Sequence, residues 1–316
     1  MKNSIKHLLC LSLCAAALQT AASAQTLLLE YTFDDYTAGS TTAKNTGSLG
    51  SAADLTLYQA VGLTGGAADR FGTAADLYSA ANTGLRNTGR AFNNTAATGM
   101  GSGGNTNTGN RAQTGNEASA AIGALQSFTV QGWFKTGGDT AIGDGAKLFE
   151  MYTTTGPKGL TVSAANGSQL ILNVDGATRT STGTAPYGAT GSWVFFAVSY
   201  DGTLTANNVN FYVGSETGPT TLVSTGTLDA GALSVTGTGL ALGNSLGSNS
   251  RPFDGLIDDI RLFGSVSDDS GVLSIGQIES LRATGAIPEP STVALIAGAS
   301  ILGAALVVRR RRSIRM

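Results

Sequence analysis

The segment GLIDDIRLF (255–263) holds the carboxylates whose spacing most clearly suggests chemistry. Side chains of a strand alternate between the two faces of a sheet, so one face would carry Leu256, Asp258, Ile260 and Leu262. Arg261 falls on the other face and indicates that this other face is the wetter one, which turns Asp258 inward. An inward carboxylate needs a cation or several backbone N–H donors. Asp258 is therefore the first candidate for a ligand-binding role.

Aromatic side chains form the second group of candidates. Trp133 lies in the segment SFTVQGWFKT, on the strand face opposite Phe128 and Phe134. An exposed Trp on this face could stack on a sugar ring, because apolar ring faces and aromatic faces fit together. Tyr187 and Trp193 could do the same from the loop before a later strand. The alternative interpretation is that these side chains belong to the core, as large aromatic residues usually do.

The N-terminus (1–24) has the pattern of a signal peptide. It combines Lys2 and Lys6, an apolar run from Leu8 to Leu18, and the small-residue cleavage site Ala22-Ser23-Ala24. We expect export through the Sec machinery and a mature chain that begins at Gln25.

Cleavage at this site would remove the only histidine and both cysteines of the chain, which are His7, Cys10 and Cys14. The exported protein would then have no imidazole base, no thiol nucleophile, no disulfide and no His/Cys zinc site. Glycoside hydrolysis requires paired carboxylates, but Glu150 stands alone in KLFEMYTTT. The adjacent pairs Asp34-Asp35 and Asp268-Asp269 are typical of turns. We therefore predict that the protein is not an enzyme.

The charge balance excludes one further class of partner. Residues 25–285 contain 12 Lys and Arg against 20 Asp and Glu, a net charge near −8. Nucleic-acid binding depends on a basic surface that meets phosphates, and no basic stripe is present here. Hard cations and neutral polymers such as glycans suit this acidic chain better.

The candidate residues must be positioned mainly by strands. The chain is rich in Gly, with 44 residues, and only 13% of it is charged, which favours short strands joined by tight turns. Asp175-Gly176 predicts a two-residue hairpin turn, and Ser274 with Gln277 predicts one capped helix that ends at Gly285. The regular series of strand patterns predicts an all-β fold, a two-sheet antiparallel jelly-roll sandwich. Residues 93–116 lack periodicity and are predicted to form a flexible Gly/Asn/Thr-rich loop.

Three parts of the chain resemble, in order, strands of LamG-like, concanavalin A-like jelly rolls. They are FTVQGWFKT, SWVFFAVSYDG with NNVNFYVGS, and FDGLIDDIRLF followed by IGQIESL, and they span much of 120–282. Members of this family often hold a structural calcium near the closing strand, which implies Asp258 as a metal ligand. Calcium takes six to eight oxygens, and the first and last strands of such sandwiches often pair. Asp34 and Asp35, at the end of the opening strand, are therefore its predicted partners. The alternative is that loop amides satisfy Asp258.

The C-terminal segment (286–316) has three parts in a fixed order. These are Pro288-Glu289-Pro290, the uncharged stretch Thr292–Val308, and the cations Arg309, Arg310, Arg311 and Arg312. The uncharged stretch is at the lower limit for one transmembrane helix, and the arginines would hold its end in the cytoplasm. The order resembles the PEP-CTERM sorting signal of Gram-negative bacteria. The resemblance implies an inner-membrane intermediate, removal of the tail by an exosortase, and a link to exopolysaccharide or the outer surface. An ordinary single-pass anchor is the alternative.

The predicted organisation is a signal peptide (1–24), one LamG-like jelly roll (25–285) and a PEP-CTERM tail (286–316). We expect an exported protein of the cell surface or extracellular matrix, with a carbohydrate-binding or adhesive module that acts on glycan or exopolysaccharide. A structural matrix protein without a specific ligand is the alternative from another class, and a glycan-active enzyme is the remote one. The fold alone does not decide between them.

Overall fold

The computed structural model describes most of the residues between Gln25 and Ala286. The described residues are 25–37, 40–58, 77–95, 109–115, 122, 124–137, 145–152, 159–165, 168–182, 191–234, 239–246 and 251–286. The predicted signal peptide (1–24) and residues 287–316 of the predicted tail lie outside them. Within the described ranges, no helix is long and apolar enough to cross a membrane.

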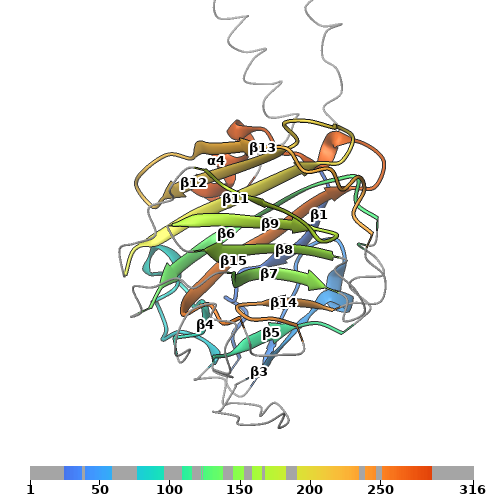
Figure 1. Cartoon of the computed structure of the whole chain (residues 1–316). Coiled ribbons are helices and arrows are strands. Elements are labelled where there is room, and N and C mark those ends of the chain that lie inside the picture. Colours follow the sequence, from blue (N-terminus) through green and yellow to red (C-terminus); the bar gives the residue numbers. More distant parts are fainter. Residues whose placement is uncertain are drawn as a thin grey trace, which may run out of the picture. The chain divides into compact units, whose positions relative to one another are not determined.

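In the described residues, fifteen strands form two antiparallel sheets that pack face to face (Figure 1). Sheet A has the order β1 (Leu27–Tyr31), β15 (Gly255–Ser265), β6 (Ser127–Thr136), β11 (Trp193–Asp201), β12 (Val209–Ser215) and β13 (Thr221–Gly226), with β4 (Phe92–Asn93) also paired to β15. Sheet B has the order β10 (Ala177–Thr180), β9 (Gln169–Val174), β8 (Gly159–Ala165), β7 (Ala146–Tyr152), β14 (Leu240–Leu242), β5 (Arg111–Gln113), β3 (Leu55–Tyr58) and β2 (Thr42–Ala43). The predicted all-β two-sheet sandwich is confirmed. The first and last strands, β1 and β15, are neighbours as expected.

The core lies between the two sheets and follows directly from the alternation of the strands. In β9, Leu170, Leu172 and Val174 are buried, and the residues between them are partly exposed. Asp175 and Gly176, with φ of 50° and 92°, form the turn that returns the chain into β10. Both residues occupy the left-handed region that such a two-residue turn requires, so the predicted hairpin is present.

A second layer covers the outer face of sheet A. Helix α4 (Ile275–Thr284) begins at a capping box between Ser274 and Gln277 and ends at Gly285, as the sequence predicts. The short 3-10 helix η2 (Leu85–Asn87) lies in the segment 83–90. We call residues 83–90 and 275–285 together the outer cover. The Arg86 guanidinium donates to the carbonyl oxygen of Arg282, so the two parts of the outer cover are tied to each other.

Two expectations about local structure are wrong. The first is the alternation around Asp258: the register shifts between Asp258 and Arg261, and Ile257 and Ile260 both face the core. The bulge contains Asp259, whose φ is 51°, and it turns Asp258 away from the core. Asp258 and Trp133 are therefore cross-strand partners, on the face beneath the outer cover.

The second concerns the predicted loop 93–116. Its described part contains strand β5, which pairs with β3 on one side and β14 on the other. Pairing of the backbone on both sides, rather than an apolar pattern, makes this segment a strand. Residues 96–108 and 116 of the predicted loop lie outside the described residues, so the expectation is wrong where β5 forms and stays a prediction for the undescribed part.

Candidate functional site

One row of cross-strand partners crosses the outward face of sheet B. The register places opposite one another, in order, Thr178, Asn173, Thr161, Glu150, Ala241, Gln113 and Thr56. Each alternates along its strand with side chains of the core, so the row faces away from the core. All but Ala241 are polar, and we call this set the polar row. It extends from β10 to β3 on the side of the molecule that Figure 1 turns to the viewer.

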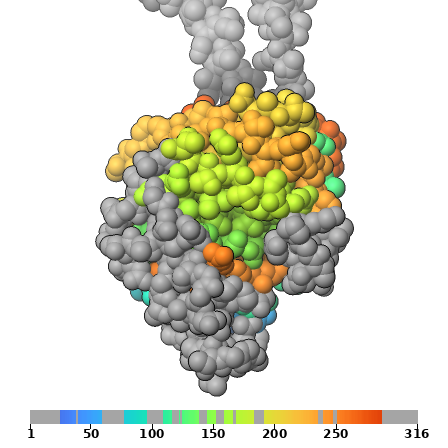
Figure 2. Space-filling view, viewed as in Figure 1, coloured from blue at the N-terminus to red at the C-terminus, as the bar shows by residue number. Residues whose placement is uncertain are grey.

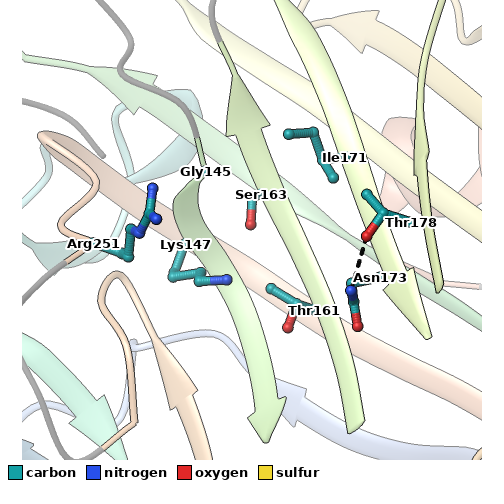
Figure 3. A pocket seen from close by; sticks show the side chains of 8 residues that line it. All are labelled: Gly145, Lys147, Thr161, Ser163, Ile171, Asn173, Thr178 and Arg251. Carbon is teal, nitrogen blue, oxygen red and sulfur yellow. Dashed lines mark hydrogen bonds between the residues drawn. The ribbon is translucent and has the colours of Figure 1, made fainter. Parts of the chain in front are cut away.

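A cavity of about 280 Å³ opens on the part of this face formed by β7 to β10 (Figure 3). Figure 2 shows the outer surface of β8 and β9 on the same side of the molecule. The cavity is lined by Gly145, Lys147, Thr161, Ser163, Ile171, Asn173, Thr178 and Arg251. These side chains supply two cations, three hydroxyls, one amide and one aliphatic surface, and they form the candidate binding site.

Lys147 enters the cavity from the start of β7. Its ammonium lies 3.2 Å from Glu150 Oε1, and the other oxygen of Glu150 accepts a hydrogen bond from the backbone N–H of Leu246. Burial lowers the pKa of Lys147, while the carboxylate of Glu150 opposes that effect and the nearby Arg251 guanidinium adds to it. The site therefore holds a desolvated cation that one carboxylate stabilises.

Arg251 approaches the same cavity from the segment before β15. Its carbonyl oxygen accepts the backbone N–H of Lys147 at 3.1 Å, and its own N–H donates to Asn244 Oδ1 at 3.1 Å. Gly145, with a φ of 82°, lies beneath the guanidinium, and a Cβ there would stand 3.5 Å from Nη1. These backbone contacts hold the two cationic residues side by side at the edge of β7.

The polar groups of the cavity suit a hydroxylated ligand. Asn173 Nδ2 donates to Thr178 Oγ1 at 2.9 Å, and Figure 3 shows this pair beside Ile171. Thr161 and Ser163 are both less than 5% exposed. Hydroxyl and amide groups act as donors and acceptors, and Ile171 offers an apolar contact. None of these described lining residues is a carboxylate.

The two described tryptophans of the predicted aromatic platform do not lie on the surface. Trp133 is 0% exposed and Trp193 is 4% exposed. Trp133 does lie on the predicted outer face of its strand, but the Phe195 ring and the Arg86 guanidinium cover it, with Arg86 5.8 Å from the ring centroid. The prediction of an exposed Trp is therefore wrong because sheet A has a second layer. Tyr187 lies outside the described residues.

The predicted metal ligands are held by backbone N–H groups. Asp258 Oδ2 accepts from Leu85 N at 2.9 Å, and Oδ1 accepts from Asp259 N at 2.8 Å. Asp34 accepts from Arg90 N at 3.2 Å, and Asp35 accepts from Lys44 N at 2.8 Å. Burial raises the pKa of Asp258 well above its usual range, and the carboxylates of Asp259 and Asp34 add to the effect.

These contacts correspond to the amide-satisfied alternative for Asp258. In the part of the chain that the structure describes, no three His, Cys, Asp or Glu side chains come together as a metal site, and calcium requires six to eight oxygens.

Calcium binding at Asp258, Asp34 and Asp35 stays a prediction with a direct measurement. If a structural calcium binds there, millimolar calcium raises the melting temperature relative to EDTA, because a ligand of the folded state stabilises that state. Magnesium at the same concentration controls for ionic strength. Equal melting temperatures in calcium and EDTA would contradict the prediction.

The candidate binding site consists of residues that the sequence interpretation did not single out. Lys147, Arg251 and the hydroxyls of β8 belong to segments separated in sequence, and only the register brings them together. The visible signal was the strand LTVSAA, in which Thr161 and Ser163 alternate with apolar residues. Of the predicted sorting motif, Pro288-Glu289-Pro290 and Arg309 to Arg312 lie outside the described residues.

Several solved structures are similar to parts of this chain. Domain 4 of AbnA, a GH43 extracellular arabinanase from Geobacillus stearothermophilus in complex with arabinotriose, has a TM-score of 0.49 and 18% identity, over 82% of this chain and 98% of that chain. The Ruminococcus gnavus IT-sialidase CBM40 bound to alpha2,3 sialyllactose has a TM-score of 0.40 and 15% identity, over 61% of this chain and 95% of that chain. No curated protein sequence matches the chain significantly.

Two family models match the sequence. The PEP-CTERM protein-sorting motif matches residues 286–312, and it indicates an exported protein that an exosortase sorts. The second model is described as the Concanavalin A-like lectin/glucanases superfamily and matches residues 102–272, which is more than half of the chain. The fold in the structure agrees with that model, and the chain belongs to the Concanavalin A-like lectin/glucanases superfamily.

Proposed function

We propose that the protein is a carbohydrate-binding module of the bacterial surface or its exopolysaccharide, and that the outward face of sheet B binds the glycan. The observation that carries this proposal is the polar row, which leads into the cavity of β7 to β10. Binding pockets combine an apolar surface with a few placed polar groups, and Ile171 with its hydroxyl and amide neighbours provides both. Membership of a superfamily that includes lectins supports the same conclusion.

Binding rather than catalysis fits the chemistry of this face. Glu150 is the carboxylate of the polar row, and its two oxygens are engaged by Lys147 and by the backbone N–H of Leu246. A carboxylate held in this way is poorly placed to transfer a proton, and glycoside hydrolysis requires a second one across the scissile bond. The proposal therefore assigns no catalytic residue.

We propose that the C-terminal tail is a sorting signal that is removed after export. The PEP-CTERM match supports a path in which the Sec machinery exports the chain, the segment 292–308 holds it briefly in the inner membrane, and an exosortase removes the tail near Pro288–Pro290. Mass spectrometry of protein recovered from the native host should then find C-terminal peptides that stop near this motif. Recovery of peptides that still carry Arg309 to Arg312 would support the single-pass anchor instead.

A tryptophan in the cavity tests the proposed binding site. Ser163→Trp is expected to weaken saturable glycan binding at least about 10-fold, because the large ring occupies the space between Lys147 and Ile171, the cross-strand neighbours of Ser163. Isothermal titration with a panel of neutral and acidic oligosaccharides measures this effect. The matched control is Thr225→Trp, an exposed position on β13 of sheet A, which should bind as the wild type does.

Two results would count against the proposal. Equal affinities for Ser163→Trp and Thr225→Trp would show that glycan binds elsewhere on the molecule. A wild-type protein that binds no oligosaccharide of the panel would favour the structural matrix alternative. Asn173→Ala, which removes a partly exposed amide of the polar row, provides a second variant if Ser163→Trp does not fold.

A further inference from the structure

We propose that the cavity takes a carboxylate-bearing sugar, with the sugar's carboxylate bound between Lys147 and Arg251 and its hydroxyls bound by Thr161, Ser163 and Asn173. This inference rests on the proposed function and names the chemical class of its ligand. The charge balance of residues 25–285 pointed to neutral glycans, whereas the local charge of the cavity points to an acidic one.

The first step is the placement of two cations on one cavity wall. Lys147 and Arg251 both line the cavity, and their side chains lie next to each other in Figure 3. The backbone hydrogen bond from Lys147 N to the Arg251 carbonyl oxygen, 3.1 Å long, fixes this proximity. An ammonium has three N–H donors and a guanidinium has five, so both cations can donate to one anion while they keep their other contacts.

The second step is the charge of the surroundings. Residues 25–285 carry 20 acidic against 12 basic side chains, yet the described lining of this cavity has two cations and no carboxylate. Glu150 approaches Lys147 from beside the cavity and binds it at 3.2 Å through one oxygen. An ammonium has three N–H donors, so Lys147 can bind a ligand oxygen while it keeps this ion pair.

The third step is the chemistry of the opposite wall. Thr161, Ser163 and Asn173 carry the hydroxyl and amide groups that recognise sugar hydroxyls, and Ile171 offers an apolar surface to a ring face. A free inorganic anion would use only the cationic wall. The combination of a cationic wall, a hydroxyl wall and an aliphatic contact therefore fits a sugar that itself bears a carboxylate. A cavity of about 280 Å³ is small, which suits one such sugar unit.

The pKa of Lys147 supports the same arrangement. Burial and the Arg251 guanidinium both lower this pKa, and Glu150 restores only part of it. A ligand carboxylate beside the ammonium would raise the pKa again, because an opposite charge favours the charged form. Binding of an acidic sugar should therefore weaken as the pH rises toward the pKa of Lys147 in the unliganded protein.

The test compares trigalacturonate with its fully methyl-esterified form, which keeps the rings and hydroxyls but lacks the charges. We expect the wild type to bind trigalacturonate at least about 10-fold more tightly than the ester, because charge-assisted hydrogen bonds are the stronger ones. Arg251→Gln should remove most of this preference. Lys44→Met, an exposed position with the same loss of charge, is the control.

The outcomes separate this inference from the proposed function. Equal affinity for the acid and the ester, or an Arg251→Gln protein that keeps the preference, overturns the inference and leaves glycan binding intact. If Lys44→Met weakens binding as much as Arg251→Gln does, the effect is long-range charge, and the inference is also overturned. If the wild type binds neither these probes nor any oligosaccharide of the wider panel, the proposed function fails together with it.

Discussion

Replacement of Trp133 by alanine is expected to lower the free energy of unfolding by about 3–5 kcal/mol and to leave the glycan affinity of the folded protein unchanged. Trp133 is 0% exposed, and its ring packs edge-on against Phe195 at 5.3 Å between centroids. Removal of a large buried ring loses its apolar contacts and leaves a cavity that the surrounding structure fills only partly. The effect on stability follows from this burial alone.

Denaturant unfolding and calorimetric titration of the same sample measure the two quantities. Leu222→Ala is the matched control, because Leu222 is 49% exposed on β13 and its truncation should change stability by less than about 0.5 kcal/mol. A Trp133→Ala protein that keeps its stability but loses glycan affinity would restore the sugar-stacking role that the sequence suggested for Trp133. It would also move the binding site from sheet B to sheet A.

The features that were predictable from the sequence depend on neighbours in the chain. The hairpin at Asp175-Gly176 follows from the left-handed backbone that these two residues adopt readily. The helix from Ile275 to Thr284 follows from the capping box at Ser274 and the glycine at its end. The sandwich itself follows from the repeated apolar alternation, since each strand has to bury one face. Each of these signals is contained in one short segment of the sequence.

The features that were not predictable depend on distant segments. The burial of Trp133 requires the outer cover, whose Leu85 lies far from Asp258 in sequence and binds it through the backbone. The orientation of Asp258 requires a bulge, which an alternating sequence pattern does not reveal. The candidate binding site depends on the register of β7, β8 and β9, which brings Lys147 opposite Ser163. A sequence pattern identifies the outward side chains of one strand but not their neighbours across the sheet.

Arg261→Met is expected to destabilise the fold by about 3–5 kcal/mol, because it removes the cation from a buried charge cluster. The Arg261 side chain is 4% exposed; its Nε lies 2.7 Å from Glu30 Oε1 and its Nη2 lies 3.5 Å from Asp259 Oδ1. Gly285, at the end of α4, lies against the guanidinium. A Cβ added to Gly285 would stand 3.5 Å from Arg261 Nη2. The alternation had placed Arg261 on the wetter face; in the structure that face is the one under the outer cover.

Most of this cost should come from the carboxylates that are left behind rather than from the lost attraction. The double variant Glu30→Gln/Arg261→Met removes one of these charges and should recover part of the stability, which thermal unfolding of the two single variants and the double variant measures as a coupling energy. Arg282→Met is the matched control: its ion pair with Glu279 is more exposed, so the loss should stay within about 1 kcal/mol. Equal losses for Arg261→Met and Arg282→Met would mean that water reaches Arg261. In that case the outer cover would not seal sheet A, and Trp133 would again be accessible to a ligand.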